Sequence, residues 1–429
     1  MLRTHYSQDV DTKDYGSTVT VAGWIEDIRN LGGIAFLILR DRTGKIQVTV
    51  IKKETPELFK ELVSLSRETV VSITGLCQEN TQVMNNWEIL PQQAHILSLA
   101  ESPLPLGVID KVGADFDTTL DNRFIDLRKK ENQSIFAIRD AFLTATHHFL
   151  HSQGFLEIHT PKITTTSPEG GTEVFSLQYF DRKAYLVQSP QLYKQIMMAT
   201  GFDRVYEIAW YFRAEEHDTS RHLNESTAID LEMAFIDNEE DIMKMAEDLT
   251  QYIMIYLTTQ RKSDMDILAT SPEIPQTPFT RITYDEALDL IQKKTDMTWG
   301  DDFGTLEERL IGETLQETFY FITQYPLETK PFYSMPNGKY ARSFDLSYQG
   351  VEIASGAQRI HQHDLLQKRM AHMAMDIDNF SEYLKAFRYG MPPHGGFGLG
   401  IERFLMELLQ VGNIRKCILF PRDRTRLTP

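Results

Sequence analysis

The segment FRAEEH, residues 212–217, places an arginine and a glutamate, Arg213 and Glu215, two positions apart. Residues two apart in a strand point to the same face. A planar guanidinium can bind a carboxylate and a phosphate together, and a neighbouring carboxylate can accept the exocyclic amine of a base. The pair therefore fits an ATP site. The same spacing is equally typical of a ladder of ion pairs on the exposed face of a hairpin.

The surrounding sequence predicts how this pair is positioned. In residues 204–235, apolar strand-like runs lie on both sides of a long polar loop. This pattern predicts an antiparallel hairpin with a functional loop. Asp230 and Glu232, also two apart, are expected to share one face of the second strand.

Several common chemistries have no motif in this chain. There is no GxxxxGK[ST] loop, and GGFGLG (395–400) does not satisfy GxGxxG. Any ATP must therefore be bound in another way. HExxH, CxxC and GxSxG are also absent, which argues against zinc-protease, metal-finger and serine-hydrolase functions.

Composition indicates an ordinary soluble protein with more than one domain. The chain has 429 residues, of which 41% are hydrophobic and 24% charged, and two distant cysteines that suggest neither a zinc site nor a disulfide framework. No run approaches the roughly 20 apolar residues of a membrane span, and the first residues lack a secretory signal, so we expect a cytoplasmic protein.

Charge restricts how the chain could contact nucleic acid. A net charge of −17 opposes broad non-specific attraction to phosphates, so contacts must use local basic patches. Two runs are candidates: residues 128–130 (RKK), and Arg422, Arg424 and Arg426 near the C-terminus. Either run could instead be solvated surface.

The first hundred residues predict a small barrel. Strand-like runs occupy residues 18–28, 34–40, 45–51, 69–76 and 87–99, and residues 55–66 have helical spacing. Five strands with a helix between the third and fourth is the order of an OB-fold, a common platform for single-stranded nucleic acid. We therefore assign residues 1–100 to an OB-fold domain.

A second domain is expected after a linker rich in proline, glycine and acidic residues. We place the linker at residues 101–122 and the second domain at residues 123–429. That domain is predicted to begin with a helix near residues 132–153, followed by strands and helices without an even βαβ rhythm. The chain is therefore predicted to be α+β.

Three segments resemble the signature motifs of class II aminoacyl-tRNA synthetases. FRAEEH followed by TSRHLNE is similar to motif 2, GFGLGIERFLMELL (396–409) to motif 3, and FLEIHTPKI (155–163) to motif 1. The motifs occur in the family's order, and the OB-like N-terminus fits subclass IIb. Four further segments resemble aspartyl-tRNA synthetases of the archaeal and eukaryal type: QSPQLYKQ (188–195), SPEGGTEVF (167–175), VEIASGAQR (351–359) and the ending LFPRDRTRLTP.

The resemblance implies an antiparallel six-stranded sheet flanked by helices, with ATP bent over it. Arg213 would bridge the substrate carboxylate and the α-phosphate, and Glu215 would hold the adenine amino group. Arg403 would bind the γ-phosphate, although it could be a helix-surface arginine. Glu352 and Ser355 would face Mg²⁺, ATP and the amino acid, since magnesium prefers oxygen ligands. The remaining ATP-binding residues implied are Arg221, His222, Leu223, Gly400, Ile401 and Glu402.

The resemblance also implies the amino acid. An aspartate pocket needs cations because an unpaired buried carboxylate is costly, and Lys194 and Arg359 would supply them. Glu169 and Gln191 would hold the α-ammonium group. Alternatively, Lys194 could be an exposed helix lysine and Arg359 part of a strand-end ion pair. Pro161 in the motif 1 segment would lie at the interface of a homodimer.

In the barrel, the family's anticodon residues correspond to Phe36 and Gln47, with Arg29 and Glu88 beside them. A single Phe in a strand is more often part of a core. Relatives that charge only tRNA-Asp tend to carry Trp and Lys where this chain has Glu26 and Met84. Rejection of tRNA-Asn is therefore left open.

The resulting hypothesis is an aspartate–tRNA ligase that uses ATP and Mg²⁺. One alternative is a ligase that charges both tRNA-Asp and tRNA-Asn, and another is a catalytically silent OB-containing RNA-binding paralogue. Two further departures from the family pattern, Trp210 and Ile360, have no functional interpretation.

Overall fold

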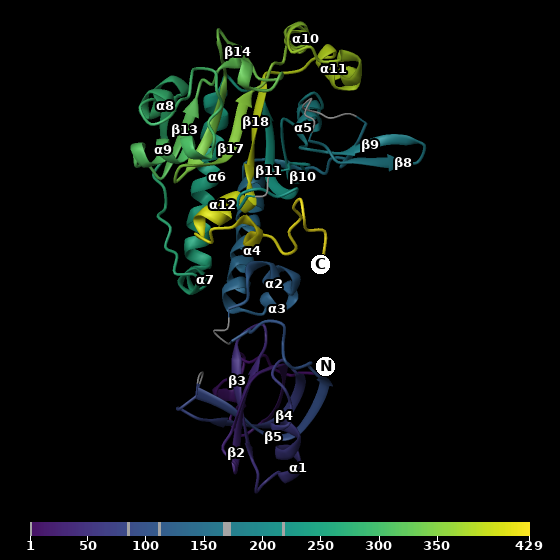
Figure 1. Cartoon of the computed structure of the whole chain (residues 1–429), viewed down its shortest axis with the longest axis vertical. Coiled ribbons are helices and arrows are strands. Elements are labelled where there is room, and N and C mark those ends of the chain that lie inside the picture. Colours follow the sequence, from purple (N-terminus) through teal and green to yellow (C-terminus); the bar gives the residue numbers. More distant parts are fainter. Residues whose placement is uncertain (1, 84–85, 110–112, 166–172, 217–218) are drawn as a thin grey trace. The chain divides into compact units, whose positions relative to one another are not determined.

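The computed structural model describes residues 2–83, 86–109, 113–165, 173–216 and 219–429. The chain divides into two compact units, Met1–Thr119 and Leu120–Pro429 (Figure 1). The predicted linker, residues 101–122, spans the point where these units divide. Across the described residues, no helix has both the length and the apolar character needed to cross a membrane.

The first unit is a closed five-stranded barrel, as predicted for an OB-fold. Its strands are β1 (Thr18–Asn30), β2 (Ile34–Arg40), β3 (Lys45–Ile51), β4 (Val70–Glu79) and β5 (Trp87–Ser98), arranged in the order β1-β2-β3-β5-β4. A short 3₁₀ helix, Thr12–Asp14, precedes β1. The barrel closes because β1 pairs in antiparallel fashion with both β2 and β4.

The α-helix that packs on the barrel strands, α1 (Pro56–Val63), lies between β3 and β4. Proline is tolerated at the first helical position because a backbone N–H at this position would have no acceptor within the helix. The helix buries Phe59 and Leu62 in the same apolar core as the inward-facing strand residues. The order of strands and helix predicted from sequence is thus confirmed.

The second unit is built on an eight-stranded sheet of order β12-β13-β16-β17-β18-β11-β10-β6. Its strands are β6 (Leu156–Glu157), β10 (Arg204–Phe212), β11 (Glu225–Ala234), β12 (Thr280–Thr283), β13 (Phe319–Thr323), β16 (Ser343–Tyr348), β17 (Val351–Gln358) and β18 (His394–Gly400). The central six strands are antiparallel, as predicted. The sheet is wider than predicted because β12 and β6 add parallel edges. These edge strands have four and two residues, too few to show a strand periodicity.

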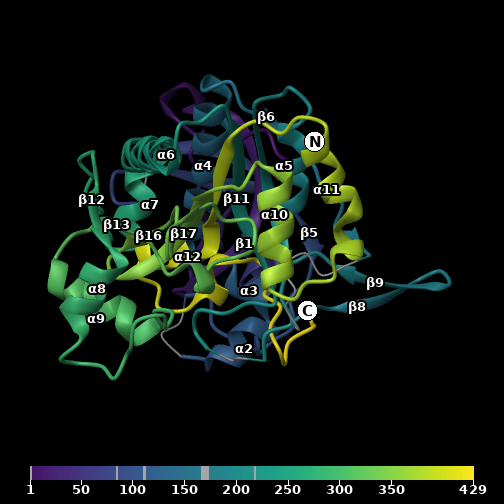
Figure 2. The same ribbon diagram turned by 90° about the horizontal axis from the view of Figure 1, so that it is seen from above.

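Helices cover the sheet and hold its core. Three of them, α4 (Lys130–Ser152), α6 (Glu239–Gln260) and α12 (Ile401–Leu408), share one apolar core with the central strands. Figure 2 shows α4 and α6 together at one side of the sheet, and α10 and α11 close to each other elsewhere. The other helices are α2 (Phe116–Asp121), α3 (Arg123–Asp126), α5 (Gln191–Met198), α7 (Lys262–Ile267), α8 (Tyr284–Ile291), α9 (Thr305–Leu315), α10 (His363–His372) and α11 (Ser381–Arg388).

Short elements complete the second unit. Two small sheets are formed by β7 (Ile163–Thr164), β8 (Ser176–Tyr179) and β9 (Arg182–Leu186), and by β14 (Pro336–Asn337) and β15 (Tyr340–Ala341). The 3₁₀ helices are η3 (Leu327–Thr329), η4 (Ile377–Phe380) and η5 (Ile414–Cys417).

Gly396 of β18 is a point where two central strands approach too closely for a side chain. A Cβ there would lie 2.0 Å from the Leu231 carbonyl oxygen and 2.4 Å from Glu232 Oε2. We expect Gly396→Ala to lower the free energy of unfolding by about 2 to 3 kcal/mol, because the backbone must shift. Gly400→Ala is the control, since its Cβ would meet nothing nearer than 3.7 Å. Equal unfolding midpoints for the two variants in a denaturant titration would contradict this.

Candidate active site

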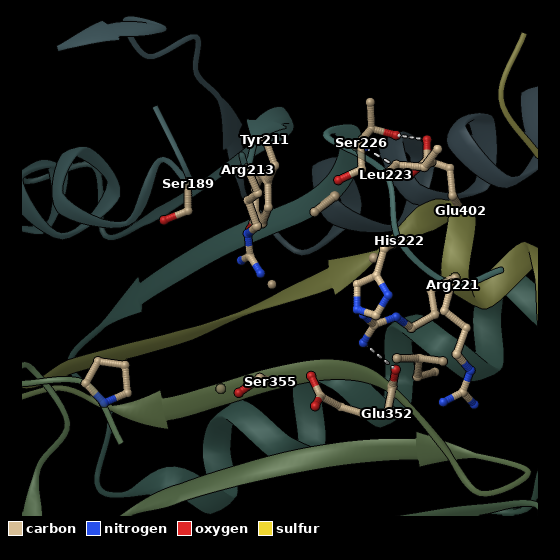
Figure 3. A pocket seen from close by; sticks show the side chains of 18 of the residues that line it. Ser189, Tyr211, Arg213, Arg221, His222, Leu223, Ser226, Glu352, Ser355 and Glu402 are labelled. Carbon is tan, nitrogen blue, oxygen red and sulfur yellow. Dashed lines mark hydrogen bonds between the residues drawn. The ribbon is translucent and has the colours of Figure 1, made fainter. Parts of the chain in front are cut away.

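A cavity of about 300 Å³ lies on the central strands of the second unit. Its walls come from the loop after β10 and from β11, β17, β18 and α12 (Figure 3). Eleven of the residues proposed from sequence line it: Arg213, Glu215, Arg221, His222, Leu223, Glu352, Ser355, Arg359, Gly400, Glu402 and Arg403. Residues far apart in the sequence are thus brought to one place.

The hairpin that carries the arginine and glutamate pair is formed as predicted, but the pair lies beyond β10 rather than within it. Strand alternation is therefore not what aligns Arg213 and Glu215. Instead, Asn224 Nδ2 donates to the carbonyl oxygens of Arg213 at 2.7 Å and Glu215 at 3.0 Å. The side chains are 3.9 Å apart from Nη1 to Oε1, which is too long for a hydrogen bond. Arg213 and Glu215 therefore lie on a loop at the cavity and do not form a ladder of ion pairs on the exposed face of the hairpin.

Arg221 on the same loop is a buried cation with spare donors. Its Nη1 lies 3.7 Å from Glu308 Oε2, and its Nη2 lies 4.0 Å from Glu407 Oε1. Within the described part of the chain, its Nε and Nη2 have no hydrogen-bond partner. Burial lowers the pKa of this guanidinium below its usual value, although it stays charged near neutral pH. Buried, unsatisfied N–H groups favour an anionic ligand.

His222, on the loop between β10 and β11, also lines the cavity. Its Nδ1 lies 2.6 Å from Thr219 Oγ1, and its Nε2 lies 3.8 Å from Glu215 Oε2. Figure 3 shows the imidazole of His222 above the side chain of Glu352. The loop therefore contributes a guanidinium, an imidazole and a carboxylate to one wall.

A bulge in β17 explains how Glu352 and Ser355, three positions apart, face the same cavity. Leu346 pairs with Ala354 while Ser347 pairs with Glu352, so the register shifts between them. An extra residue at a bulge re-aims the side chains beyond it. Figure 3 shows both side chains on the cavity side of the strand.

Asp345 of β16 was not identified from sequence. It pairs directly with Ser355, so the two side chains lie on the same side of the sheet. Burial, and next the charge of Asp345, raise the pKa of Glu352 to about 8. The available signal was FDLSYQGVEIAS, in which an acid stands one hairpin away from Glu352, but the bulge that aligns them is not readable from residue types.

This arrangement fits a magnesium ion bound with ATP. The Oδ1 atom of Asp345 is buried and, in the described residues, accepts no hydrogen bond. No cluster of three or more His, Cys, Asp or Glu side chains suited to a metal occurs in the described part of the chain. A pair of carboxylates is nevertheless sufficient for Mg²⁺, which is commonly held by one or two carboxylates plus substrate phosphates.

The raised pKa of Glu352 predicts a dependence of stability on pH. Between about pH 4.5 and 8, the folded chain holds a proton that the unfolded chain has lost, so stability falls as pH rises through 8. We expect Glu352→Gln to be less affected than the native chain. Its free energy of unfolding should fall by about 3 kcal/mol less between pH 5.5 and 8.5. Denaturant titrations without metal or nucleotide test this, and equal pH slopes would contradict it.

The motif 3 segment forms the floor of the cavity. Gly398 and Gly400 of β18 line the cavity, and a Cβ at Gly398 would lie 2.9 Å from the Tyr211 hydroxyl oxygen. Gly400 is the N-cap of α12, and Arg403 on that helix donates to the Glu352 carbonyl oxygen at 3.2 Å. This arginine lines the cavity, and the alternative of a helix-surface residue is wrong.

The two other motif 3 residues proposed for ATP have structural contacts. Ile401 is fully buried in the core. Glu402 accepts hydrogen bonds from the Thr227 backbone at 2.9 Å and its hydroxyl at 2.6 Å, and pairs with Arg139 at 2.8 Å. Its carboxylate therefore anchors α12 to β11.

The cations proposed for the amino acid are buried beside the cavity. Lys194 Nζ lies 2.6 Å from Asp230 Oδ1 and 3.3 Å from Glu232 Oε2. Arg359 Nε lies 3.0 Å from Glu232 Oε1. Burial alone would raise the pKa of Glu232, but Arg359 and Lys194 outweigh it and hold this pKa below its usual value.

These ion pairs show that the alternative for Lys194, an exposed helix lysine, is wrong. The residue is only 2% exposed, so it is not a surface helix lysine. Arg359 lines the cavity, whereas Lys194 and Gln191 are not among the described residues that line it. Gln191 Oε1 accepts from Arg359 Nη2 at 3.3 Å, and Glu169 lies outside the described residues. Tyr211 and Asp230, joined by a short hydrogen bond, also belong to this region and were not proposed as site residues.

Comparison with known proteins agrees with this geometry. Residues 115–424 match the family described as "tRNA synthetases class II (D, K and N)", and residues 19–97 match "OB-fold nucleic acid binding domain". The chain belongs to the class II aminoacyl-tRNA synthetases.

Relatives within this family cover the whole chain. A protein of Thermococcus kodakarensis named "Aspartate--tRNA(Asp) ligase" is 50% identical over 100% of both chains. A protein of Methanosarcina barkeri named "Aspartate--tRNA(Asp/Asn) ligase" is 48% identical over 100% of this chain and 99% of its own. Both names therefore occur at similar identity.

Solved structures are similar across both units. An asparaginyl-tRNA synthetase from Pyrococcus horikoshii, complexed with asparaginyl-adenylate, is 32% identical with a TM-score of 0.92 and full coverage of both chains. An aspartyl tRNA synthetase from Entamoeba histolytica is 33% identical with a TM-score of 0.86, covering 97% of this chain and 91% of its own.

In the synthetase's barrel, the proposed anticodon residues form two cross-strand pairs. Arg29 of β1 pairs with Phe36 of β2, and Gln47 of β3 pairs with Glu88 of β5. Phe36 is half-buried and lies outside the barrel core cluster. Gln47 Nε2 donates a hydrogen bond to Glu88 Oε2 at 3.0 Å. The amide oxygen of Gln47 is therefore the atom of this side chain that would accept a hydrogen bond from a base.

The discrimination residue Glu26 points inward. It is 7% exposed, and its carboxylate lies 3.3 Å from Arg40 and 2.5 Å from Lys45. Met84 lies outside the described residues. Pro161, proposed for the dimer interface, is exposed beside Ile163, whose exposed fraction is 45%.

Proposed function

We propose that this synthetase is an aspartate–tRNA ligase, which activates L-aspartate with ATP and transfers it to the 3′ end of tRNA-Asp. The observation that carries this proposal is Arg359, a buried cation that lines the ATP cavity and shares Glu232 with the buried Lys194. Asp230 and Glu232 offset the two positive charges when no substrate is present. A guanidinium has five N–H donors, so Arg359 can pair with a substrate carboxylate while it keeps Glu232. This suits aspartate better than asparagine, because a buried carboxylate is costly without compensation. The names of the full-length relatives agree with this assignment.

In the first step, an oxygen of the aspartate α-carboxylate attacks the α-phosphorus of ATP in line. The bond to the oxygen bridging to the β-phosphate breaks, and pyrophosphate leaves with that electron pair. Arg213 binds both the carboxylate and the α-phosphate, which aligns the reacting atoms and offsets the charge that develops. Arg403 and Arg221 bind the remaining phosphates, and Glu215 holds the adenine amino group. No side chain needs to act as a nucleophile.

The residues that would hold a magnesium ion are Asp345, Glu352 and Ser355. When bound with ATP, Mg²⁺ supplies neutralisation of phosphate charge. Deprotonation of Glu352 is required for this role. Its raised pKa means that the approach of cationic charge must lower it, which couples the carboxylate's ionisation to substrate binding.

In the second step, the terminal 3′-hydroxyl of the tRNA attacks the carbonyl carbon of aspartyl-adenylate. AMP leaves, and the hydroxyl proton passes to a phosphate oxygen of the leaving group. The barrel meanwhile binds the anticodon, with Phe36 as a stacking platform and Gln47, Arg29 and Glu88 beside it.

The stacking role of Phe36 gives a direct test. We expect Phe36→Ala to weaken tRNA-Asp binding by about 10- to 100-fold, because stacking on an aromatic side chain contributes about 1 to 3 kcal/mol per base. Aspartate-dependent ATP–pyrophosphate exchange should be unchanged. The control is Tyr15→Ala, which removes another exposed aromatic from the same unit. Equal tRNA affinities of the two variants in a filter-binding titration would show that Phe36 does not stack on a base.

A second candidate, charging of both tRNA-Asp and tRNA-Asn, is favoured by one observation. Glu26 is held by Arg40 and Lys45, so it is not presented as a tRNA contact. Charging assays with purified tRNA-Asp and tRNA-Asn decide between the two. Charging of tRNA-Asp alone supports the strict ligase, charging of both supports the second candidate, and charging of neither contradicts the proposed function.

We further propose a homodimer that works in the cytosol, where translation takes place. The family's motif 1 segment supports the first part, because exposed Leu156, Pro161 and Ile163 follow one another beside the edge strand β6. Analytical ultracentrifugation tests it. A sedimenting mass of about twice the 49.5 kDa chain is expected, and a monomer at micromolar concentration contradicts the proposal.

A further inference from the structure

Lys330 is a cavity residue to which the synthetase motifs give no role. It follows η3 and precedes Pro331, and both residues line the cavity. Its Nζ donates to Asp345 Oδ2 at 2.8 Å and lies 3.6 Å from the centre of the Tyr325 ring. The side chains of Lys330 and Asp345 are only 11% and 7% exposed, so the ion pair is shielded from water.

The two oxygens of Asp345 have different surroundings. Oδ2 accepts the hydrogen bond from Lys330, whereas Oδ1 is buried and has no partner in the described part of the chain. A buried acceptor without a partner costs free energy unless a ligand satisfies it. Asp345 shares a side of the sheet with Ser355, near Glu352. The unpaired oxygen therefore suits a cation that arrives with ATP.

Lys330 forms an ion pair with Asp345 that is shielded from water. Its positive charge offsets the repulsion between the Asp345 carboxylate and the neighbouring Glu352. Lys330 also restricts rotation of the Asp345 carboxyl group, because a turn would break a buried charged hydrogen bond.

We propose that Lys330 is a positioning residue, which holds Asp345 by Oδ2 so that Oδ1 faces the divalent metal of the ATP complex. This inference rests on the proposed function. In the contrary case, the Lys330 ammonium group would occupy the metal's place and compete with the metal. Removing a positioning residue lowers the affinity for the metal, whereas removing a competitor raises it.

The test is a Mn²⁺ titration of the full-length chain, followed by the electron paramagnetic resonance signal of the free ion. We expect Lys330→Met to bind Mn²⁺ about tenfold more weakly than the native chain, approaching Asp345→Asn. Arg281→Met is the control, since Arg281 pairs with Glu247, a buried carboxylate outside the cavity, at 2.9 Å. It should bind Mn²⁺ as the native chain does. Equal or tighter binding by Lys330→Met overturns the proposal.

A second variant keeps the proposal testable if Lys330→Met does not fold. Lys330→Gln retains an N–H donor without the charge, and its Mn²⁺ affinity should lie between those of the native chain and Asp345→Asn. An affinity equal to or above the native value overturns the proposal. Aspartate-dependent exchange by the native chain is measured separately. Its absence contradicts the proposed function, whereas its presence with unaltered Mn²⁺ binding by the Lys330 variants contradicts only this inference.

Discussion

Replacement of Arg213 by glutamine is expected to reduce aspartate-dependent ATP–pyrophosphate exchange by about a thousandfold. Removing one preorganised charge-stabilising donor from an active site typically costs a hundredfold to a thousandfold in rate. Arg213 should be at the upper end of this range, because it contacts both reactants and therefore aligns them as well. Its guanidinium extends into the cavity from the end of β10 (Figure 3). Initial exchange rates at saturating ATP and aspartate are the measurement.

The matched control for Arg213 lies at the other end of the same strand. Arg204 begins β10 and donates to the Gln153 carbonyl oxygen at 2.8 Å, and it does not line the cavity. We expect Arg204→Gln to retain exchange within about twofold of the native rate. If Arg213→Gln were no more affected than Arg204→Gln, the cavity would not be the site of adenylate formation.

Replacement of Lys194 by methionine is expected to raise the aspartate KM by about a hundredfold or more. It should also lower the free energy of unfolding by about 3 to 5 kcal/mol, because Asp230 and Glu232 lose a buried partner. These two effects can be separated. The double variant Lys194→Met with Asp230→Asn removes one negative charge together with the positive one, so it should recover stability without recovering aspartate activation.

Arg281→Met is the control for Lys194 as well. It breaks an ion pair with the buried Glu247 away from the cavity, so it should lose stability without a specific change in the aspartate KM. Thermal melts and exchange kinetics on the same samples provide both readouts. A Lys194→Met variant with a near-native aspartate KM would remove the physical basis for assigning aspartate rather than asparagine.

The barrel and the hairpin were predictable from sequence because both depend on local patterns. Each barrel strand is long enough to show its alternation, and the first two turns, between β1 and β2 and between β2 and β3, contain glycine. The edge strands β6 and β12 were not predictable. They are short, and their parallel pairing depends on segments far away in sequence.

The sequence named many of the residues that line the cavity, but it could not show what holds them in place. The motif resemblance led to Arg213, Glu352 and Arg403, all of which line the cavity. It could not show that Asn224 aligns Arg213 with Glu215 through hydrogen bonds to backbone carbonyls. Side-chain contacts to backbone leave no spacing pattern in a sequence.

The roles of Asp345 and Asp230 also could not be predicted from the sequence, for a different reason. Both are acids on buried strands, where a sequence alone cannot distinguish a structural ion pair from a ligand site. The structure shows their partners, Lys330 for Asp345 and Lys194 for Asp230. Lys330 precedes Asp345 by 15 positions and lies outside its strand, and Lys194 lies on a helix that precedes the strand of Asp230.

Amino-acid-dependent ATP–pyrophosphate exchange by the purified native chain measures whether this cavity forms aspartyl-adenylate. We predict exchange with L-aspartate and Mg²⁺, and at least a hundredfold less with L-asparagine at equal concentration. Exchange driven by asparagine, or no exchange with aspartate by a folded chain that still binds tRNA, would contradict the proposed function.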